Sequence, residues 1–101
     1  MRERLPERRQ HELFEIDHAG IRYVVGVGRF RNGDLAEIFL NAPKTGTAAA
    51  VNAQDAAIAA SLLFQHGCPV ETLRRALTRN PDGSAAGPLG AVLDLLNGAQ
   101  A

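Results

Sequence analysis

The chain has one cysteine, Cys68, no tryptophan, and an aromatic content of only 5% in 101 residues. A single cysteine excludes an intramolecular disulfide bond. Because aromatic side chains are so few, the core must be built mainly from Val, Ile, Leu and Ala. Such small side chains allow neighbouring elements to pack closely.

The chain also lacks an excess of charge of either sign and lacks long apolar runs. Eleven Lys and Arg residues balance eleven Asp and Glu residues, which argues against a general binder of nucleic acids or anionic membranes. There is no leading run of the signal-peptide type and no apolar stretch of about 18 residues, the length that spans a bilayer. We therefore expect one cytoplasmic domain with no membrane association.

A basic arm stands at the start of the sequence. The first ten residues, MRERLPERRQ, hold four arginines and two glutamates and are interrupted by Pro6. We expect residues 1–12 to form an exposed arm and residues 13–98 to form a single α+β domain. Arg4, Arg8 and Arg9 are candidates for contact with a partner protein or a phosphate group. The glutamates interleaved with them favour a protein partner over a nucleic acid.

Three short runs of residues predict strands. Residues 13–17 are densely apolar, residues 21–30 place apolar side chains at every second position, and residues 35–41 are apolar in both alternating sets. Turn-forming residues separate the runs at 17–20 and at Asn32-Gly33, where both residues tolerate the positive φ of a type I′ turn. We expect an antiparallel meander. Gly26 and Gly28, inside the second run, predict either a close approach by a helix or a bulge.

From residue 52 the periodicity becomes helical. One helical face carries residues spaced by three and four: Asp55, Ile58, Ala59, Leu62, Leu63 and His66. The frequent alanines, at 53, 56, 57, 59 and 60, favour helix and permit tight packing on the sheet. Gly67 is placed to end this helix, Pro69 to begin a second and Pro88 to begin a third. The predicted fold is therefore α+β, a three-stranded antiparallel meander followed by two to three helices packed on one face.

A sheet that is covered on one side leaves its other side open. We expect Tyr23, Phe39 or Leu35 to be partly exposed on that open side, since a domain of this size forms only two layers. A contiguous apolar patch there would favour a homodimer or docking onto a partner protein.

Several motifs along the chain resemble those of the TSCPD domain family. The matching positions are Glu37, Ile38 and Phe39 in the third strand; Lys44, Gly46 and Thr47 in the following loop; Gln65, Gly67, Pro69 and Glu71; the start at Arg4 to Arg9; and Gly87 to Gly90. The Thr-Ser-Cys-Pro-Asp string that names the family is absent, and Pro43 precedes Lys44. This family is found as a C-terminal module of adenosylcobalamin-dependent ribonucleotide reductases and as small stand-alone bacterial proteins.

The resemblance implies a non-catalytic accessory or binding module. Its partner would be a second copy of the chain or another protein, such as a ribonucleotide reductase. Ribonucleotide reduction needs a thiyl-forming cysteine and a pair of reducing cysteines, which one cysteine cannot supply. The three histidines, His11, His18 and His66, are not spaced as metal ligands. We therefore expect no catalytic residue, no metal site and no cofactor.

Two other hypotheses concern small sites. Lys44, Thr45, Gly46 and Thr47 present small side chains and free N–H groups near a helix start, which predicts an anion or nucleotide site. The alternative is a plain connection in which Thr47 caps the helix. Cys68, near the start of a helix, is a candidate nucleophile of a small enzyme. The alternative for it is a small residue that fills the junction between two helices.

Overall fold

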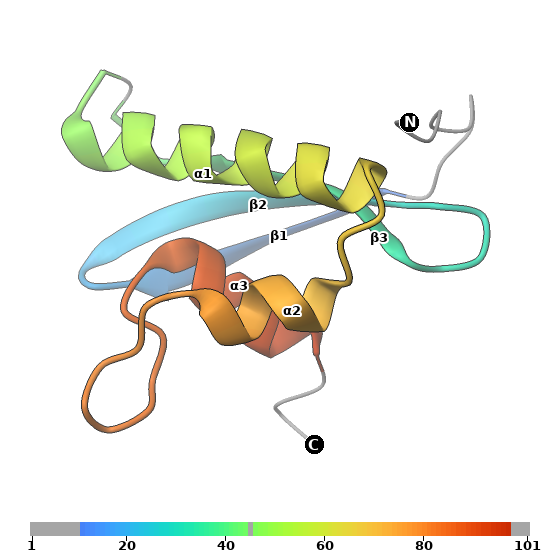
Figure 1. Ribbon diagram of the computed structural model, residues 1–101. Coiled ribbons are helices and arrows are strands. Elements are labelled where there is room, and N and C mark those ends of the chain that lie inside the picture. The colour runs from blue at the N-terminus through green and yellow to red at the C-terminus, as the bar shows by residue number, and fades with distance from the viewer. Residues whose placement is uncertain (1–10, 45, 98–101) are drawn as a thin grey trace.

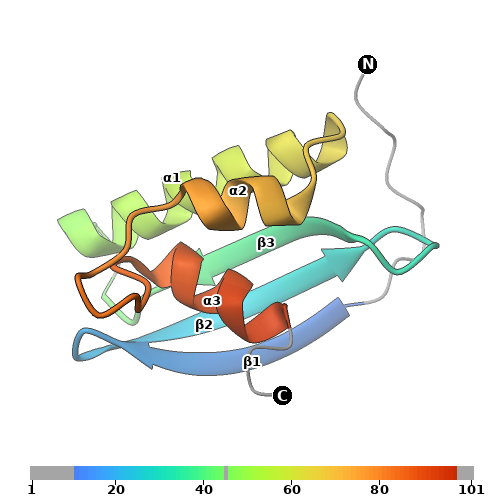
Figure 2. The same ribbon diagram turned by 60° about the horizontal axis from the view of Figure 1, so that its bottom comes forward.

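The computed structural model describes residues 11–44 and 46–97 (Figure 1). The elements follow in the order β1 (His11–His18), β2 (Ile21–Arg29), β3 (Leu35–Asn41), α1 (Ala48–Gln65), α2 (Val70–Ala76) and α3 (Pro88–Leu96). The strands form one antiparallel sheet in the order β1-β2-β3. Figure 2 shows the helices on one side of this sheet, with α1 along β3. The predicted α+β meander followed by helices on one face is confirmed.

The two hairpins use different turns. Between β1 and β2, Ala19 and Gly20 both have positive φ, 53° and 80°, as a two-residue type I′ turn requires. Between β2 and β3 only Gly33 has a positive φ, 93°. There Asn32 uses its side-chain oxygen to accept the Asp34 N–H at 2.9 Å. The type I′ turn predicted at Asn32-Gly33 is therefore wrong, because this loop is longer and needs only one left-handed residue.

The core lies between the covered face of the sheet and the helices. On the sheet side it consists of Tyr23, Val25 and Val27 from β2 and Ile38 and Leu40 from β3, all of them buried. On the helix side it consists of alanines of α1, Phe64, and the α3 residues Leu89, Val92 and Leu93. Burial of one such aliphatic side chain contributes about 1.5–3 kcal/mol.

Gly26 and Gly28 face the uncovered side of the sheet. A β-carbon at Gly26 would lie 3.3 Å from the Phe39 ring, and one at Gly28 would lie only 2.7 Å from the Glu37 side chain. These glycines make room for side chains of β3. The predicted helix approach is wrong, because the helices lie on the other side. The predicted bulge is confirmed by a register shift between Gly28 and Arg29.

Helix α1 turns its alanines towards the sheet. Ala50, Ala53, Ala57 and Ala60 are buried, whereas Ile58 is 57% exposed. The predicted packing of alanines on the sheet is confirmed for Ala53, Ala57 and Ala60, whereas the apolar face with Ile58 lies outward and the predicted start at residue 52 is wrong. A row of small residues permits close contact between this helix and β3, which Ile or Leu in the same places would prevent.

Side chains of α1 bind the free edge of β3. The Ser61 hydroxyl accepts the Ile38 N–H at 2.9 Å and lies 3.1 Å from the Ile38 carbonyl oxygen. The Gln65 amide donates to the Ala36 carbonyl at 3.2 Å. Backbone groups at the edge of a sheet otherwise bind water or a strand of another chain. Side chains of α1 therefore bind backbone groups of Ala36 and Ile38 that a fourth strand could otherwise bind.

A cluster of ion pairs joins α2 to α3. Arg74 bonds Glu71 at 2.8 Å and Asp94 at 3.1 Å, and Arg79 bonds Asp94 at 2.7 Å. Arg75 pairs with Glu71 at 2.7 Å, as their spacing predicts. Hydrogen bonds from Arg79 and Arg74 lower the pKa of Asp94 to about 2. Those from Arg74 and Arg75 lower the pKa of Glu71 to about 2.

Candidate functional site

The loop predicted to bind an anion forms the cap of α1. The Thr47 hydroxyl accepts the Ala50 N–H at 3.1 Å and donates to the Lys44 carbonyl at 3.3 Å. Gly46, with a φ of 82°, turns the chain into the helix. Thr45 lies outside the described residues. The capping interpretation of Thr47 is confirmed, and nucleotide binding by this loop stays a prediction.

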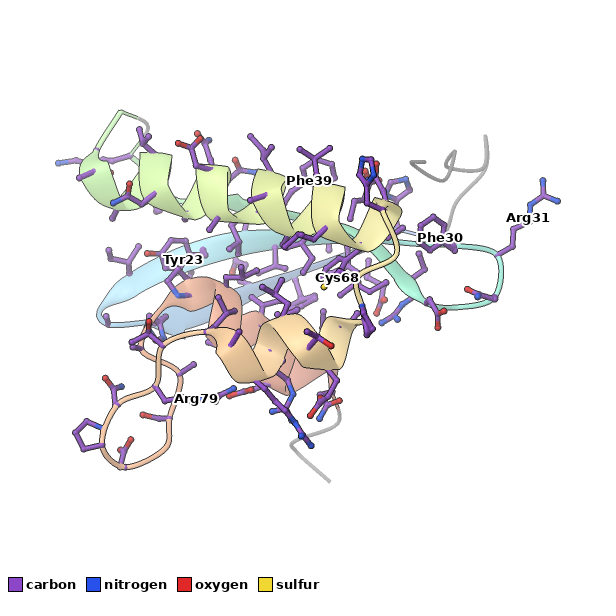
Figure 3. All side chains as sticks on the ribbon, viewed as in Figure 1. Tyr23, Phe30, Arg31, Phe39, Cys68 and Arg79 are labelled. Carbon is purple, nitrogen blue, oxygen red and sulfur yellow. The ribbon has the colours of Figure 1, made fainter. Side chains whose placement is uncertain are left out.

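Arginines on the sheet are paired with neighbouring carboxylates. Arg22 bonds Asp17 at 3.0 Å and Arg29 bonds Glu12 at 2.9 Å, and the hydrogen bond from Arg22 lowers the pKa of Asp17. Arg31, at the tip of the β2–β3 loop, points away from the body of the protein (Figure 3). The three arginines predicted to contact a partner or phosphate lie outside the described residues: Arg4, Arg8 and Arg9. Their contacts stay predictions.

Cys68 lies at the junction of α1 and α2. Its thiol is partly exposed and donates to the Pro69 carbonyl at 3.5 Å. It borders an open hollow of about 550 Å³ that Asp34 and Glu71 also line, and no histidine is among the lining residues. The base that activates a nucleophile in many cysteine enzymes is therefore absent from this hollow. Residues 11–44 and 46–97 also contain no group of three His, Cys, Asp or Glu side chains that could hold a metal ion.

Exposed apolar side chains gather on the uncovered side of the sheet. Leu13, Gly26 and Phe39 form one row across the strands, in which Leu13 is 78% exposed and Phe39 is 47% exposed. Val24, on the same side, is 42% exposed. Because Gly26 has no side chain, those of Leu13 and Phe39 both lie over it, within 3.5 Å of the position a β-carbon would take. We name Leu13, Val24 and Phe39 the outer-sheet patch.

The sequence predicted only part of this patch. Phe39 is exposed as expected, but Tyr23 and Leu35 are buried, so the prediction is wrong for both. Tyr23 belongs to the covered face by the alternation of β2. Leu13 and Val24 were missed, although the same alternation, applied to β1 and β2, places them on the side of Phe39.

A second exposed apolar surface lies on α1. It consists of Val51, Ile58, Leu62 and Leu63, each more than 40% exposed. Most of these side chains belong to the apolar face identified from the sequence, and they face outward because the alanines of the helix take the inward positions. We name them the α1 outer stripe. The domain therefore presents apolar side chains on both of its layers.

The chain was compared with known proteins. A stretch of 77 residues, 76% of this chain, is 36% identical to part of a vitamin B12-dependent ribonucleotide reductase from Agrobacterium fabrum. The chain is related to a segment of that reductase. It spans only 6% of the length of this relative. No protein-family profile and no solved structure matches the chain.

The relationship agrees with the type of protein that the motifs indicate. The matched stretch covers 6% of the reductase, so the relationship concerns one small region of that enzyme. The described helices include none that is both long and apolar enough to cross a membrane.

Proposed function

We propose that this chain is a non-catalytic TSCPD-type module that binds another protein through the outer-sheet patch. The observation that carries the proposal is the row formed by Leu13, Gly26 and Phe39, in which two large apolar side chains are exposed on either side of a glycine. Single exposed apolar residues are common on protein surfaces, whereas contiguous ones mark binding sites.

The surroundings of the patch support a protein partner. Val24 extends the apolar centre, and towards the β1–β2 turn the ion pairs of Arg22 with Asp17 and Glu15 border it. An apolar centre with a polar, charged border is the usual composition of a protein–protein interface. A small-molecule site would instead be concave.

A non-catalytic role is supported by what the described residues hold. The thiol of Cys68 has no histidine beside it in the hollow that it borders. The carboxylates Glu71 and Asp94 are both bound by arginines: Glu71 pairs with Arg74 within α2, and Asp94 joins α3 to Arg74 and Arg79. Both groups therefore have structural surroundings, which suit a module that acts by binding.

A vitamin B12-dependent ribonucleotide reductase is the first partner to test, because a segment of such an enzyme is related to this chain. The test is to measure the affinity of the full chain for the purified reductase of its own host by calorimetry. The key variant is Leu13→Lys, and the matched control is Leu95→Lys, which makes the same change at an exposed leucine of α3. We expect Leu13→Lys to weaken binding at least roughly tenfold, since it places a charge in the apolar centre, and Leu95→Lys to bind as the wild type does.

The mass of the chain in solution separates the two possible partners. If the wild-type chain is a dimer by light scattering and Leu13→Lys is a monomer, the patch joins two copies of the chain. If the wild type is a monomer and both variants bind the reductase equally well, or neither binds, the proposed role of the patch is wrong. Both variants should keep the wild-type unfolding midpoint, since both leucines are exposed.

A further inference from the structure

A cavity of about 440 Å³ lies at the end of the sheet where β1 turns into β2. Its walls come from that turn and β2, the first half of α1, the end of α2 with the residues after it, and the start of α3. The lining residues are His18, Ala19 and Tyr23; Ala49, Asn52, Ala53 and Ala56; Leu77 and Thr78; and Ala86 to Gly90. In Figure 1 these segments meet at the end of the molecule where α1 begins. The volume falls within the range of about 300–1,000 Å³ that is typical of small-molecule sites.

Tyr23 is the buried polar side chain in this cavity. The residue is only 3% exposed, and Figure 3 shows it between α1 and the layer that contains α3. Its hydroxyl makes no hydrogen bond to any described residue. Since every fully buried side-chain N or O atom of the described residues has a partner, the hydroxyl of Tyr23 is not fully buried. Tyr23 is one of the residues that line the cavity, so its unpartnered hydroxyl is available to a ligand bound there.

The start of α3 supplies further hydrogen-bond donors to the same cavity. Gly87 is the N-cap residue and offers no side-chain cap, and no acidic residue lies in the first turn. The first intrahelical bond of this turn runs from Ala91 N–H to the Gly87 carbonyl at 3.2 Å. The N–H groups of Leu89 and Gly90 precede it and have no acceptor within the helix. Such a helix start attracts a negative charge.

The remaining walls fit a ligand with an apolar body. The alanines of α1, with Leu77 and Leu89, line most of the surface, and the lining residues include no Asp, Glu, Lys or Arg. An anion therefore meets no negative side chain there. By contrast, the hollow beside Cys68 is lined by Asp34 and Glu71, which repel an anion.

We propose that this cavity binds a small carboxylic acid. The apolar body packs against Ala53 and Ala56 of α1, and the carboxylate accepts hydrogen bonds from the Tyr23 hydroxyl and from the N–H groups at the start of α3. This site is on the helix side of the sheet, away from the outer-sheet patch. Its function is therefore independent of the proposed protein partner.

The test uses phenylacetate as the probe and phenylacetamide as its uncharged counterpart. Each is added to the ¹⁵N-labelled chain, and amide resonances are followed by NMR. We expect phenylacetate to shift the resonances of Leu89 and Gly90 at millimolar concentration, and phenylacetamide to shift them much less. Tyr23→Phe removes only the hydroxyl and should weaken phenylacetate binding roughly tenfold, the effect of losing one hydrogen bond to a charged group.

A second pair of variants tests the site without changing Tyr23. Ala56→Leu extends a side chain from the wall into the cavity and should abolish binding. Ala59→Leu makes the same change on the exposed side of the same helix and should leave binding unchanged. The proposal is overturned if neither compound shifts Leu89 and Gly90, if the amide binds as well as the carboxylate, or if Ala56→Leu and Tyr23→Phe bind as the wild type does.

Discussion

The two faces of the sheet are built from the same three strands and have opposite surroundings. On the covered face, Val27 and Ile38 are buried against helices. On the uncovered face, Leu13 and Phe39 stand exposed beside Gly26. Neighbouring residues of one strand thus belong either to the core or to a surface. The difference shows that apolar character alone does not decide where a side chain lies in this domain, since both faces contain Leu, Val or Phe.

The largest effect that tests this comparison is expected at Ile38. Ile38→Ala removes a buried side chain and should lower the free energy of unfolding by about 2–5 kcal/mol. Phe39→Ala, one residue further along β3 but on the uncovered face, should lower it by less than about 1 kcal/mol. Urea unfolding of both variants measures the difference. Equal losses would show that the uncovered face contributes to the core, which would break the comparison.

The glycines of β2 give the next largest effect, and they act on the uncovered face. A β-carbon at Gly28 would lie 2.7 Å from the Glu37 side chain, against 3.3 Å between a β-carbon at Gly26 and the Phe39 ring. Gly28→Ala should therefore cost about 1–3 kcal/mol, the range for overpacking, and Gly26→Ala should cost less. Thermal or urea unfolding tests this order, and a larger loss from Gly26→Ala would contradict it.

The third prediction concerns the contribution of the ion pairs between α2 and α3 to the stability of the layer that covers the sheet. Asp94→Asn removes the charge that Arg74 and Arg79 share and should cost about 1–2 kcal/mol near pH 7. Because the folded pKa of Asp94 is lowered to about 2, the stability it contributes is present above the unfolded value near pH 4 and is lost as the pH falls through about 2. Urea unfolding at several pH values should show the wild type and the variant converging in acid. A difference at pH 2 as large as that at pH 7 would contradict this assignment.

The smallest effect is expected at the cap of α1. Thr47→Ala removes the acceptor of the Ala50 N–H and should cost about 1 kcal/mol. Thr47→Ser keeps the hydroxyl and should retain most of the stability. Helix content by circular dichroism and the unfolding midpoint measure both variants. If Thr47→Ala leaves the unfolding midpoint unchanged, the cap does not stabilise α1.

Much of the fold was predictable from local rules. The alternation of β2 and β3, the helix-ending Gly67 with its φ of 95°, and Pro88 at the first position of α3 each follow from properties of a few adjacent residues. The inward face of α1 followed only in part. Hydrophobicity favours Ile58 and Leu62 over alanine, but the structure buries the alanines of α1 against the sheet and brings Ser61 into hydrogen-bond contact with β3.

The candidate sites were less predictable than the fold. The loop at Lys44 to Thr47 has residues typical of an anion site, and Thr47 uses its hydroxyl as a helix cap. The cavity beside Tyr23 has no motif, because its walls come from four segments that are far apart in the sequence. Only the packing of α1 and α3 over the sheet brings them together. The outer-sheet patch was partly predictable. The alternation of the strands places its side chains on one face of the sheet, but their exposure depends on whether a further layer covers that face.

The hydrogen bonds from Ser61 and Gln65 to β3 limit the ways in which copies of this domain can assemble. Growth of a continuous sheet from molecule to molecule requires two free edges on each copy. Helix α1 occupies the edge at β3, so that, of the sheet described here, β1 alone is left as an outer strand without a covering helix along its edge. A molecule with one free edge has a valence of one for strand pairing. Pairing of this kind stops at two copies and forms no filament.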